Sequence, residues 1–328
     1  MKIAILGCGS VGRGIAEVIS KKNLDIKITG LADSKSGIID NNGININQAL
    51  KRKQETGTCG DTSVSVTEII KSADYDVLVE VTPTDAITGE PALGYIKTAL
   101  KRGKHVVTSN KGPVALQYQS LKKIAEENNV LLRYEATVCG AIPIIHTLEH
   151  GLAGNEIKRL YGIFNGTCNY ILSRMADEKL TYSQALLEAR ELGYAEADPT
   201  YDIKGIDAAI KLVILANTLW DMGKSLDDVL ITGIDNVTSD ALALSGEEDA
   251  TIRLIAEIIP KTGVLRVSPR ILSKHHLLVV QDTLNAVTIE TDLAGDITLI
   301  GKGAGSLETA SAIISDLLFI RDCHVKRS

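Results

Sequence analysis

The first 135 residues alternate short apolar runs with stretches in which apolar residues recur every three or four positions. Short apolar runs bounded by polar or glycine residues are typical of buried strands, and the longer repeat is typical of amphipathic helices. Strands are therefore predicted at residues 3–6, 26–32, 76–80, 105–108 and 130–134. Helices are predicted at residues 11–20, 90–102 and 114–128, with a shorter one near 47–55. This alternation predicts an α/β domain over residues 1–135, built on a doubly wound parallel sheet.

The pattern changes after residue 135, where longer helical repeats mix with strand-like runs. Helices are predicted at residues 142–151, 182–192 and 205–220. Strands are predicted at residues 160–164, 264–269, 277–280 and 286–290. We expect a second, α+β domain over residues 136–300. The remaining segment, 301–328, begins with a glycine-rich turn and continues as a helix.

Composition excludes several classes of protein. The chain is 45% hydrophobic and 23% charged, and its formal net charge of -6 argues against nucleic acid as a partner. No apolar run approaches the ~20 residues that span a bilayer, so no membrane partner is expected. The five cysteines are scattered and odd in number, which favours reduced thiols over a disulfide framework. We expect a cytoplasmic protein.

A glycine fingerprint follows the first predicted strand. Gly7, Gly9 and Gly12 form a GxGxxG that encloses Ser10 and Val11 and opens a helix. In such a loop the first glycine permits a tight turn, the second lets the backbone approach a pyrophosphate, and the third lets the helix pack on the strand. The helix N-terminus then faces the anion. This context predicts dinucleotide binding in a Rossmann-type domain.

The residues near the fingerprint leave the choice between NAD and NADP open. Asp33 ends the second predicted strand, where an acid binds a ribose 2′-hydroxyl, and this favours NAD. Lys35 and Arg13 are cations that can neutralise the 2′-phosphate of NADP. Lys35 can equally be a solvated loop residue.

An acid-rich segment, 191–211, carries the strongest chemical signal. It holds several carboxylates and ends in a predicted helix with Asp207 and Lys211 at positions i and i+4, which share one face. An isolated pair of this kind is usually a surface ion pair. Here apolar residues surround it, which predicts a buried helix and makes the pair a functional candidate. Lys111 is a second candidate, because it follows a strand at the carboxyl edge of the parallel sheet, where ligands bind.

The segment 191–211 resembles the signature of the homoserine dehydrogenase family. Four further stretches are similar to that family in the same order, at residues 108–113, 135–143, 165–170 and 301–312. The resemblance implies NAD(P)-dependent interconversion of L-aspartate 4-semialdehyde and L-homoserine, in the threonine and methionine branch of amino-acid biosynthesis. It also implies a homodimer, with a sheet of the second domain shared across it, and a segment 301–328 that returns to the nucleotide-binding domain.

The resemblance assigns roles to individual residues. Lys211 would exchange the proton with the reacting oxygen, Lys111 would hold that oxygen beside the nicotinamide, and Asp207 would bind the substrate. Glu196 would pair with the substrate ammonium, and the same pocket would be lined by Tyr194 and Asp202. Thr82 and Gly303 would contact the cofactor.

The family also binds a monovalent cation, usually sodium, through main-chain oxygens. The residues at those positions are Glu135, Val138, Gly140 and Ile142. Carbonyl oxygens are suitable hard ligands for such an ion. Cys139 departs from the family pattern, which has a glycine there. Because the chain is short, we expect neither a kinase domain nor a C-terminal regulatory domain.

Two rival functions are considered. An aspartate semialdehyde dehydrogenase would form a thioester on a cysteine, for which Cys139 and Cys168 are the candidates, and it would produce NADPH in a phosphate-dependent reaction. A nucleotide-sensing protein would bind NAD(P) without turning over homoserine. The acid-rich segment and the two lysines argue against the second rival.

Overall fold

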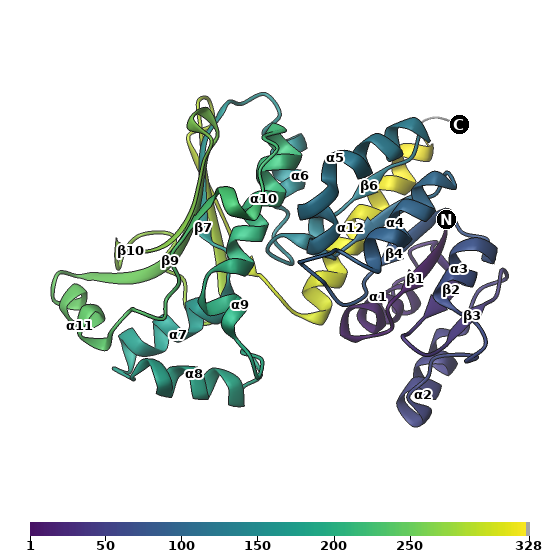
Figure 1. The fold of residues 1–328 in the computed structure, drawn as a ribbon, viewed down its shortest axis with the longest axis horizontal. Helices are drawn as coiled ribbons and strands as arrows, with labels where there is room; N and C mark the ends of the chain where they lie inside the picture. Colours follow the sequence, from purple (N-terminus) through teal and green to yellow (C-terminus); the bar gives the residue numbers. More distant parts are fainter. Residues whose placement is uncertain (326–328) are drawn as a thin grey trace. The chain divides into compact units, whose positions relative to one another are not determined.

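The computed structural model describes residues 1–325 and divides into two compact units (Figure 1). Unit 1 comprises Met1–Gly140 and Gly305–Ser328, and unit 2 comprises Ala141–Ala304. The units therefore change at Gly140 and Ala304, a few residues beyond positions 135 and 300 that the sequence suggested. Unit 2 is inserted into the sequence of unit 1, and each unit is described by itself below.

The sheet of unit 1 has the strand order β3-β2-β1-β4-β5-β6. Five strands run parallel, and they are β1 (Lys2–Leu6), β2 (Lys27–Ala32), β4 (Val77–Glu80), β5 (His105–Thr108) and β6 (Leu132–Arg133). All five were predicted, and the Rossmann-type fold is confirmed. The sequence pattern missed β3 (Gly37–Ile39), which pairs antiparallel with β2 at the edge. Three residues are too few to show an alternation.

Helices cover both faces of this sheet (Figure 1). On one face, α1 (Ser10–Lys21) and α12 (Ser306–Val325) pack against Ile3 and Ile5 of β1. On the other face, α4 (Ala92–Lys101) and α5 (Lys111–Glu127) pack with the alternate residues Ala4 and Leu6. The remaining helices are α2 (Ile46–Thr56), α3 (Val66–Ser72) and the 3-10 turn η1 (Glu135–Thr137). A strand with both faces buried reads as an unbroken apolar run, as in Ile3–Leu6.

Unit 2 contains a largely antiparallel sheet with the order β12-β11-β7-β9-β10-β8, so the predicted second α+β domain is confirmed. Its strands are β7 (Ile157–Ile163), β8 (Val229–Ile231), β9 (Ala250–Ile259), β10 (Val264–Ser273), β11 (Leu284–Thr291) and β12 (Asp296–Lys302). The central strand β9 was missed by the sequence pattern. Its residues are buried on both faces, with Arg253 and Glu257 among them, so no alternation marks it.

The strand predicted at residues 277–280 is wrong. This segment is a turn, in which Val279 N–H donates to the His276 carbonyl and Val280 N–H to the Leu278 carbonyl. Leu278 and Val280 are nevertheless buried in the cluster with Ile163 and Ile255. The apolar residues of 277–280 are therefore buried against the sheet, but their backbone does not pair as a strand within it.

The helices of unit 2 are α6 (Ile144–His146), α7 (Gly166–Asp177), α8 (Tyr182–Glu191), α9 (Thr200–Ile203), α10 (Ile206–Trp220) and α11 (Ser239–Glu247), with the short turns η2 (Thr147–Gly151), η3 (Leu226–Asp228) and η4 (Pro260–Thr262). The sequence missed α7. Helix α10 lies along the sheet (Figure 1) and buries every residue from Asp207 to Asn217. Among residues 1–325, no helix combines the length and apolar character needed to cross a membrane.

Candidate active site

The fingerprint glycines meet three different steric demands. Gly7 has φ +107°, and a Cβ there would lie 2.4 Å from the Val81 carbonyl oxygen. A Cβ on Gly12 would lie 1.8 Å from the Gly7 carbonyl oxygen. A Cβ on Gly9 would meet nothing within 4 Å. The space beside Gly9 opens at the N-terminus of α1, where Ser10 and Val11 begin the helix, and it fits a pyrophosphate.

The C-terminal helix meets the fingerprint loop through a residue that the sequence did not single out. Ser306, the first residue of α12, donates its hydroxyl to the Ser10 carbonyl at 2.6 Å. A Cβ on Gly14 would lie 2.7 Å from the same hydroxyl. The returning segment thus closes on the start of α1. The small residues at positions 10, 14 and 306 are the sequence feature that could have predicted this close approach.

Asp33 is held by donors from its own domain. One carboxylate oxygen accepts from Lys35 N, Ser36 N and the Ser36 hydroxyl at 2.8, 2.8 and 3.0 Å. The other accepts from Lys53 Nζ and Cys59 N, both at 2.7 Å. Burial alone would raise the pKa of Asp33, but these hydrogen bonds, led by that of Lys53, hold it well below its usual value. Only 6% of the residue is exposed. The side chain of Lys35 is exposed.

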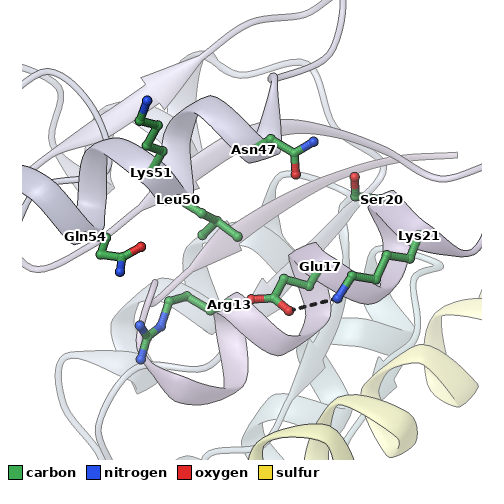
Figure 2. A pocket seen from close by; sticks show the side chains of 8 residues that line it. All are labelled: Arg13, Glu17, Ser20, Lys21, Asn47, Leu50, Lys51 and Gln54. Carbon is green, nitrogen blue, oxygen red and sulfur yellow. Dashed lines mark hydrogen bonds and ion pairs between the residues drawn. The ribbon is translucent and has the colours of Figure 1, made fainter.

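Arg13 lies at one end of a polar groove between α1 and α2 (Figure 2). Its Nε donates to the Gly9 carbonyl at 3.3 Å, which keeps the guanidinium close to the fingerprint loop. The groove is lined by Arg13, Glu17, Ser20, Lys21, Asn47, Leu50, Lys51 and Gln54. Within it, Glu17 and Lys21 form an exposed ion pair at 3.4 Å.

A buried carboxyl organises the ends of β4 and β5. Glu80 is fully buried, and it accepts hydrogen bonds from the backbone N–H and hydroxyl of Thr82 and from the Thr108 hydroxyl. Thr108 Oγ1 in turn accepts from Asn110 N–H at 2.9 Å. Burial raises the pKa of Glu80, and the hydrogen bonds oppose this rise. A role was predicted for Thr82 but none for Glu80.

Lys111 follows this network directly, as the first residue of α5 after its N-cap Asn110. Asn110 is 1% exposed and its Nδ2 donates to the carbonyls of Thr82 and Pro83, each at 3.3 Å. Lys111 therefore stands at the carboxyl edge of the parallel sheet, on a backbone fixed to the loop that carries Thr82. This is the ligand-binding edge of such a sheet.

Unit 2 brings together Lys211 and Asp207, two of the residues expected to act on substrate. Lys211 Nζ donates to Asp207 Oδ2 at 2.8 Å and to the Phe164 carbonyl at 2.6 Å. Both side chains are nearly buried, with side-chain exposures of 9% for Lys211 and 8% for Asp207. The contact between positions i and i+4, and the burial of the helix, are as the sequence predicted.

Asn165 joins this pair to Asp202. Its Nδ2 donates to Asp202 Oδ1 at 2.6 Å and to Asp207 Oδ2 at 2.9 Å. Its Oδ1 caps α7 by accepting from Cys168 N–H at 2.9 Å. The stretch 165–170 was part of the family resemblance, but no role was predicted for Asn165. An asparagine before a helix is typical of an ordinary N-cap.

Tyr194 and Glu196 lie in the turn after α8. Gly193 has φ +74°, the left-handed conformation expected of a residue that follows a helix. The Tyr194 carbonyl accepts from the Thr167 hydroxyl at 2.8 Å, and its ring packs edge-on against Tyr170 at 4.9 Å. Tyr194 is thereby placed against the first turn of α7, the helix whose N-cap is Asn165. Glu196 is exposed.

The cysteine candidates lie in the core. Cys168 is fully buried, its thiol donates to the Asp202 carbonyl at 3.1 Å, and burial raises its pKa well above the usual value. A thiol in this state is a poor nucleophile. Cys139 is 1% exposed and has φ +55°, a conformation that favours glycine.

The proposed cation ligands lie on the chain that leaves unit 1. Glu135 N–H donates to the buried Asp316 Oδ2 of α12 at 2.9 Å, which ties the start of this stretch to the C-terminal helix. The carbonyls of Glu135 and Ile142 accept backbone hydrogen bonds from Val138 and Ile144. A carbonyl oxygen has a second lone pair, so these bonds leave each able to ligate a cation.

Gly303 lies in unit 2, where a Cβ would be 2.2 Å from the amide nitrogen of Asn285. Asn285 is 1% exposed, and its side-chain nitrogen and oxygen are buried without a partner among the described residues. The absence of a side chain at Gly303 thus makes room for a buried amide. Two residues later the chain re-enters unit 1.

Comparison with known proteins covers most of the chain. A family profile described as homoserine dehydrogenase matches residues 143–318, and one described as the NAD binding domain of homoserine dehydrogenase matches residues 7–135. A homoserine dehydrogenase of Methanocaldococcus jannaschii is 45% identical over 98% of both chains. An NAD(+)-dependent homoserine dehydrogenase of Pseudomonas canavaninivorans is 36% identical over 99% of this chain and 97% of its own. The solved structure of a hyperthermophilic archaeal homoserine dehydrogenase with NADPH has a TM-score of 0.84 at 32% identity, covering 97% of this chain and 96% of that one.

Proposed function

The chain belongs to the homoserine dehydrogenase family and is an NAD(P)-dependent oxidoreductase that interconverts L-aspartate 4-semialdehyde and L-homoserine, and we propose that Lys211 moves the proton in this reaction. The observation that carries the proposal is the buried pair of Lys211 and Asp207 on α10. When the aldehyde is reduced, its oxygen gains negative charge, and the Lys211 ammonium gives that oxygen a proton. In the reverse direction Lys211 takes the proton from the hydroxyl of homoserine.

The residues of unit 1 fit a dinucleotide, which supplies or accepts the hydride when it is bound. The open space beside Gly9 and the N–H groups of Ser10 and Val11 would hold the pyrophosphate. Thr82 would contact a ribose, and Lys111 would bind the reacting oxygen. We propose Arg13, Asp33 and Lys35 at the adenosine end, and Gly303 as a further cofactor contact.

We propose that Asp207, Asp202, Tyr194 and Glu196 bind the substrate. Homoserine carries an ammonium group, and the carboxylates of this set are suitable partners for it. Glu196 is exposed, so its carboxylate is accessible to an entering substrate. The functional division proposed for the chain is therefore a dinucleotide-binding unit 1 and a substrate-binding unit 2.

The deciding experiment is absorbance at 340 nm with L-homoserine and either NAD or NADP. We expect wild-type turnover, and a fall of about 10²–10⁴-fold for Lys211→Ala. Lys204→Ala is the matched control, because Lys204 also pairs with an aspartate, Asp235 at 2.6 Å, but is about half exposed. Its rate should stay within about twofold of wild type, since surface pairs contribute little. Intact cofactor binding without turnover of homoserine would instead support the nucleotide-sensing protein.

The same assay tests the thioester alternative. A semialdehyde dehydrogenase would reduce NADP with L-aspartate 4-semialdehyde and inorganic phosphate, and it would lose activity in a Cys168→Ala variant. We expect no such phosphate-dependent reduction, because the Cys168 thiol is buried and its pKa is raised.

We further propose a monovalent cation, sodium, at the carbonyls of Glu135, Val138, Gly140 and Ile142. The support is the run of left-handed residues at Cys139 and Gly140, which turns the backbone within this stretch. Turnover measured in sodium, potassium and tetramethylammonium buffers of equal ionic strength tests it. Equal rates in all three would contradict a functional cation.

We also propose a cytoplasmic homodimer. Unit 2 exposes large apolar side chains on its strands, with Leu230 at 66%, Ile271 at 69% and Ile300 at 53%. Strands β8 and β12, which carry the first and last, are the edges of the sheet. A second copy that covers these side chains would remove them from water. Sedimentation showing a stable monomer at micromolar concentration would contradict the dimer, and activity confined to the membrane fraction of a lysate would contradict the location.

A further inference from the structure

Asn165 has each of its amide atoms committed. Oδ1 accepts from the Cys168 N–H at the start of α7. If the amide were flipped, its NH₂ group and the Cys168 N–H would both be donors and could not hydrogen-bond each other. Nδ2 must therefore point the other way. There it has two N–H groups and meets two carboxylates, Asp202 at 2.6 Å and Asp207 at 2.9 Å.

The two carboxylates come from different elements, Asp202 from α9 and Asp207 from α10. Both hydrogen-bond the same amide nitrogen, so they are close neighbours, and two like charges in a partly buried site repel each other. The amide places a positive dipole between them. Asn165 is itself 5% exposed, so little water competes for its N–H groups.

The same geometry determines the surroundings of Lys211. Titratable groups around it include Asp207 on its own helix, Asp202 on α9 and the Cys168 thiol on α7, and the Phe164 carbonyl accepts from its Nζ. The strands packed against the start of α10 contribute the apolar Val267 and Ile231. The negative charge near Lys211 thus includes two carboxylates that hydrogen-bond Asn165.

We propose that Asn165 is a positioning residue, which holds Asp202 and Asp207 together as hydrogen-bond acceptors and thereby fixes the charge beside Lys211. This rests on the proposed function of Lys211. The cap and the two donors are separate properties of one side chain, so substitutions can remove one and keep the other.

Asn165→Ser keeps a capping oxygen and removes both N–H donors. We expect kcat to fall by about tenfold to a hundredfold, because the carboxylates move apart and the proton-transfer geometry loosens. The KM for the cofactor should not change. Asn165→Asp also keeps the cap but adds a third carboxylate near Lys211, which favours the protonated ammonium. The limb of the pH–rate profile that reports proton transfer should move about one pH unit or more upward.

Asn45 supplies the matched control, because it caps α2 through the same contact, with Oδ1 accepting from Gln48 N–H at 3.1 Å. Asn45→Ser and Asn45→Asp should leave kcat and the pH–rate profile unchanged. A purely structural role for Asn165 predicts that its variants resemble those of Asn45 after correction for stability.

A second readout does not need turnover. Reductive methylation of Lys211 with formaldehyde and sodium cyanoborohydride, followed by mass spectrometry as a function of pH, reports when its amine becomes uncharged. We expect this titration to move upward in Asn165→Asp. If wild-type protein fails to turn over homoserine, the proposed function fails, while the methylation arm still decides the inference. Wild-type-like titration in Asn165→Asp, or kcat within about twofold of wild type in Asn165→Ser, would overturn it. If Asn165→Asp does not fold, the serine variant decides alone.

Discussion

At the scale of single residues, the fingerprint glycines separate folding from binding. A side chain on Gly12 would collide with the backbone of Gly7, whereas one on Gly9 would meet empty space. Both glycines belong to one sequence motif, so the motif alone cannot tell these roles apart. The difference comes from which atoms lie opposite each Cα.

This difference predicts opposite outcomes for two alanine variants. Gly12→Ala should lower the free energy of unfolding by about 2–4 kcal/mol without cofactor, because the backbone must shift to admit the methyl group. Gly9→Ala should leave that free energy within about 0.5 kcal/mol and weaken NAD(P)H binding at least about tenfold. Urea unfolding and cofactor fluorescence measure the two quantities. Equal destabilisation by both variants would contradict the separation.

Asp33 illustrates what a sequence motif leaves undetermined. Its position after β2 was predicted, but two of its donors, Lys53 and Cys59, are distant in sequence. The residues near position 33 do not predict that Lys53 and Cys59 would donate to its carboxylate. Asp33, which was expected to bind a ribose hydroxyl, thus also stabilises its own domain through these hydrogen bonds.

Its pKa gives a pH prediction. The pKa of Asp33 is lower in the folded protein than its ordinary value of 3.8, so the charged form stabilises the fold above that pH. The stabilisation is lost as pH falls below the ordinary value towards the folded one. Asp33→Asn should therefore be less stable than wild type near about pH 7, and the gap should narrow near about pH 3. Urea unfolding at both pH values measures it. A gap independent of pH would show that the charge of Asp33 is irrelevant.

At the scale of elements, the sheet of unit 2 buries an ionic network. Glu257 of β9 has a side chain only 4% exposed and accepts from Arg159 of β7 at 2.6 Å and from Arg270 of β10 at 2.8 Å. Burial would raise the pKa of Glu257, but the arginines lower it overall. One carboxylate thereby connects three neighbouring strands.

Removing this carboxylate should be costly. Glu257→Ala removes the carboxylate that Arg159, Arg266 and Arg270 share, and we expect a loss of about 3–5 kcal/mol of unfolding free energy. Thermal denaturation measures it. Glu127→Ala is the control, because Glu127 pairs with Lys123 at 3.9 Å on an exposed helix surface, and its effect should stay below about 0.5 kcal/mol. A loss for Glu257→Ala no larger than the control's would mean that solvent or neighbouring groups replace the carboxylate.

The elements also show how far the sequence pattern reaches. The five parallel strands of unit 1 were predictable, because each is a short apolar run between turn residues, whereas the three-residue edge strand β3 was not. The i and i+4 pair of α10 was predictable from the helical repeat. Strand β9 was not, because the buried Arg253 and Glu257 interrupt its apolar pattern. Arginines on β7 and β10 compensate for the burial of Glu257, whereas Arg253 donates to the Thr251 hydroxyl and the Ile252 carbonyl of β9 itself. Asn165 was not, because its two acceptors lie 37 and 42 residues away.

At the scale of the whole molecule, α12 completes a unit that begins at the other end of the chain. Asp316 is fully buried in α12 and accepts from Arg133 Nε at 3.2 Å and from Glu135 N–H at 2.9 Å. These bonds join residues about 180 positions apart, since their separations are 183 and 181. Unit 1 is therefore stabilised by contacts that bypass unit 2 in the sequence.

Asp316→Ala should weaken unit 1 selectively. The variant leaves Arg133 largely buried beside an empty acceptor position, and we expect a loss of about 3–5 kcal/mol. Hydrogen exchange followed by mass spectrometry should show reduced protection in residues 1–140 and 305–325, and unchanged protection in 141–304. Asp322→Ala is the control on the same helix, because its side chain is 62% exposed. A uniform loss of protection across both units would indicate that they unfold together.

The insertion of unit 2 has a consequence for synthesis on the ribosome. Every residue of unit 2 leaves the ribosome before α12 does, although unit 1 starts first. Unit 2 can complete its core while the nascent nucleotide-binding sheet still exposes the apolar face that α12 covers, including Ile3 and Ile5. During translation the order of completion is thus the reverse of the order in sequence. Chaperones bind transiently exposed apolar surface of this kind. We therefore expect them to bind residues 1–140 of the nascent chain until α12 has been synthesised.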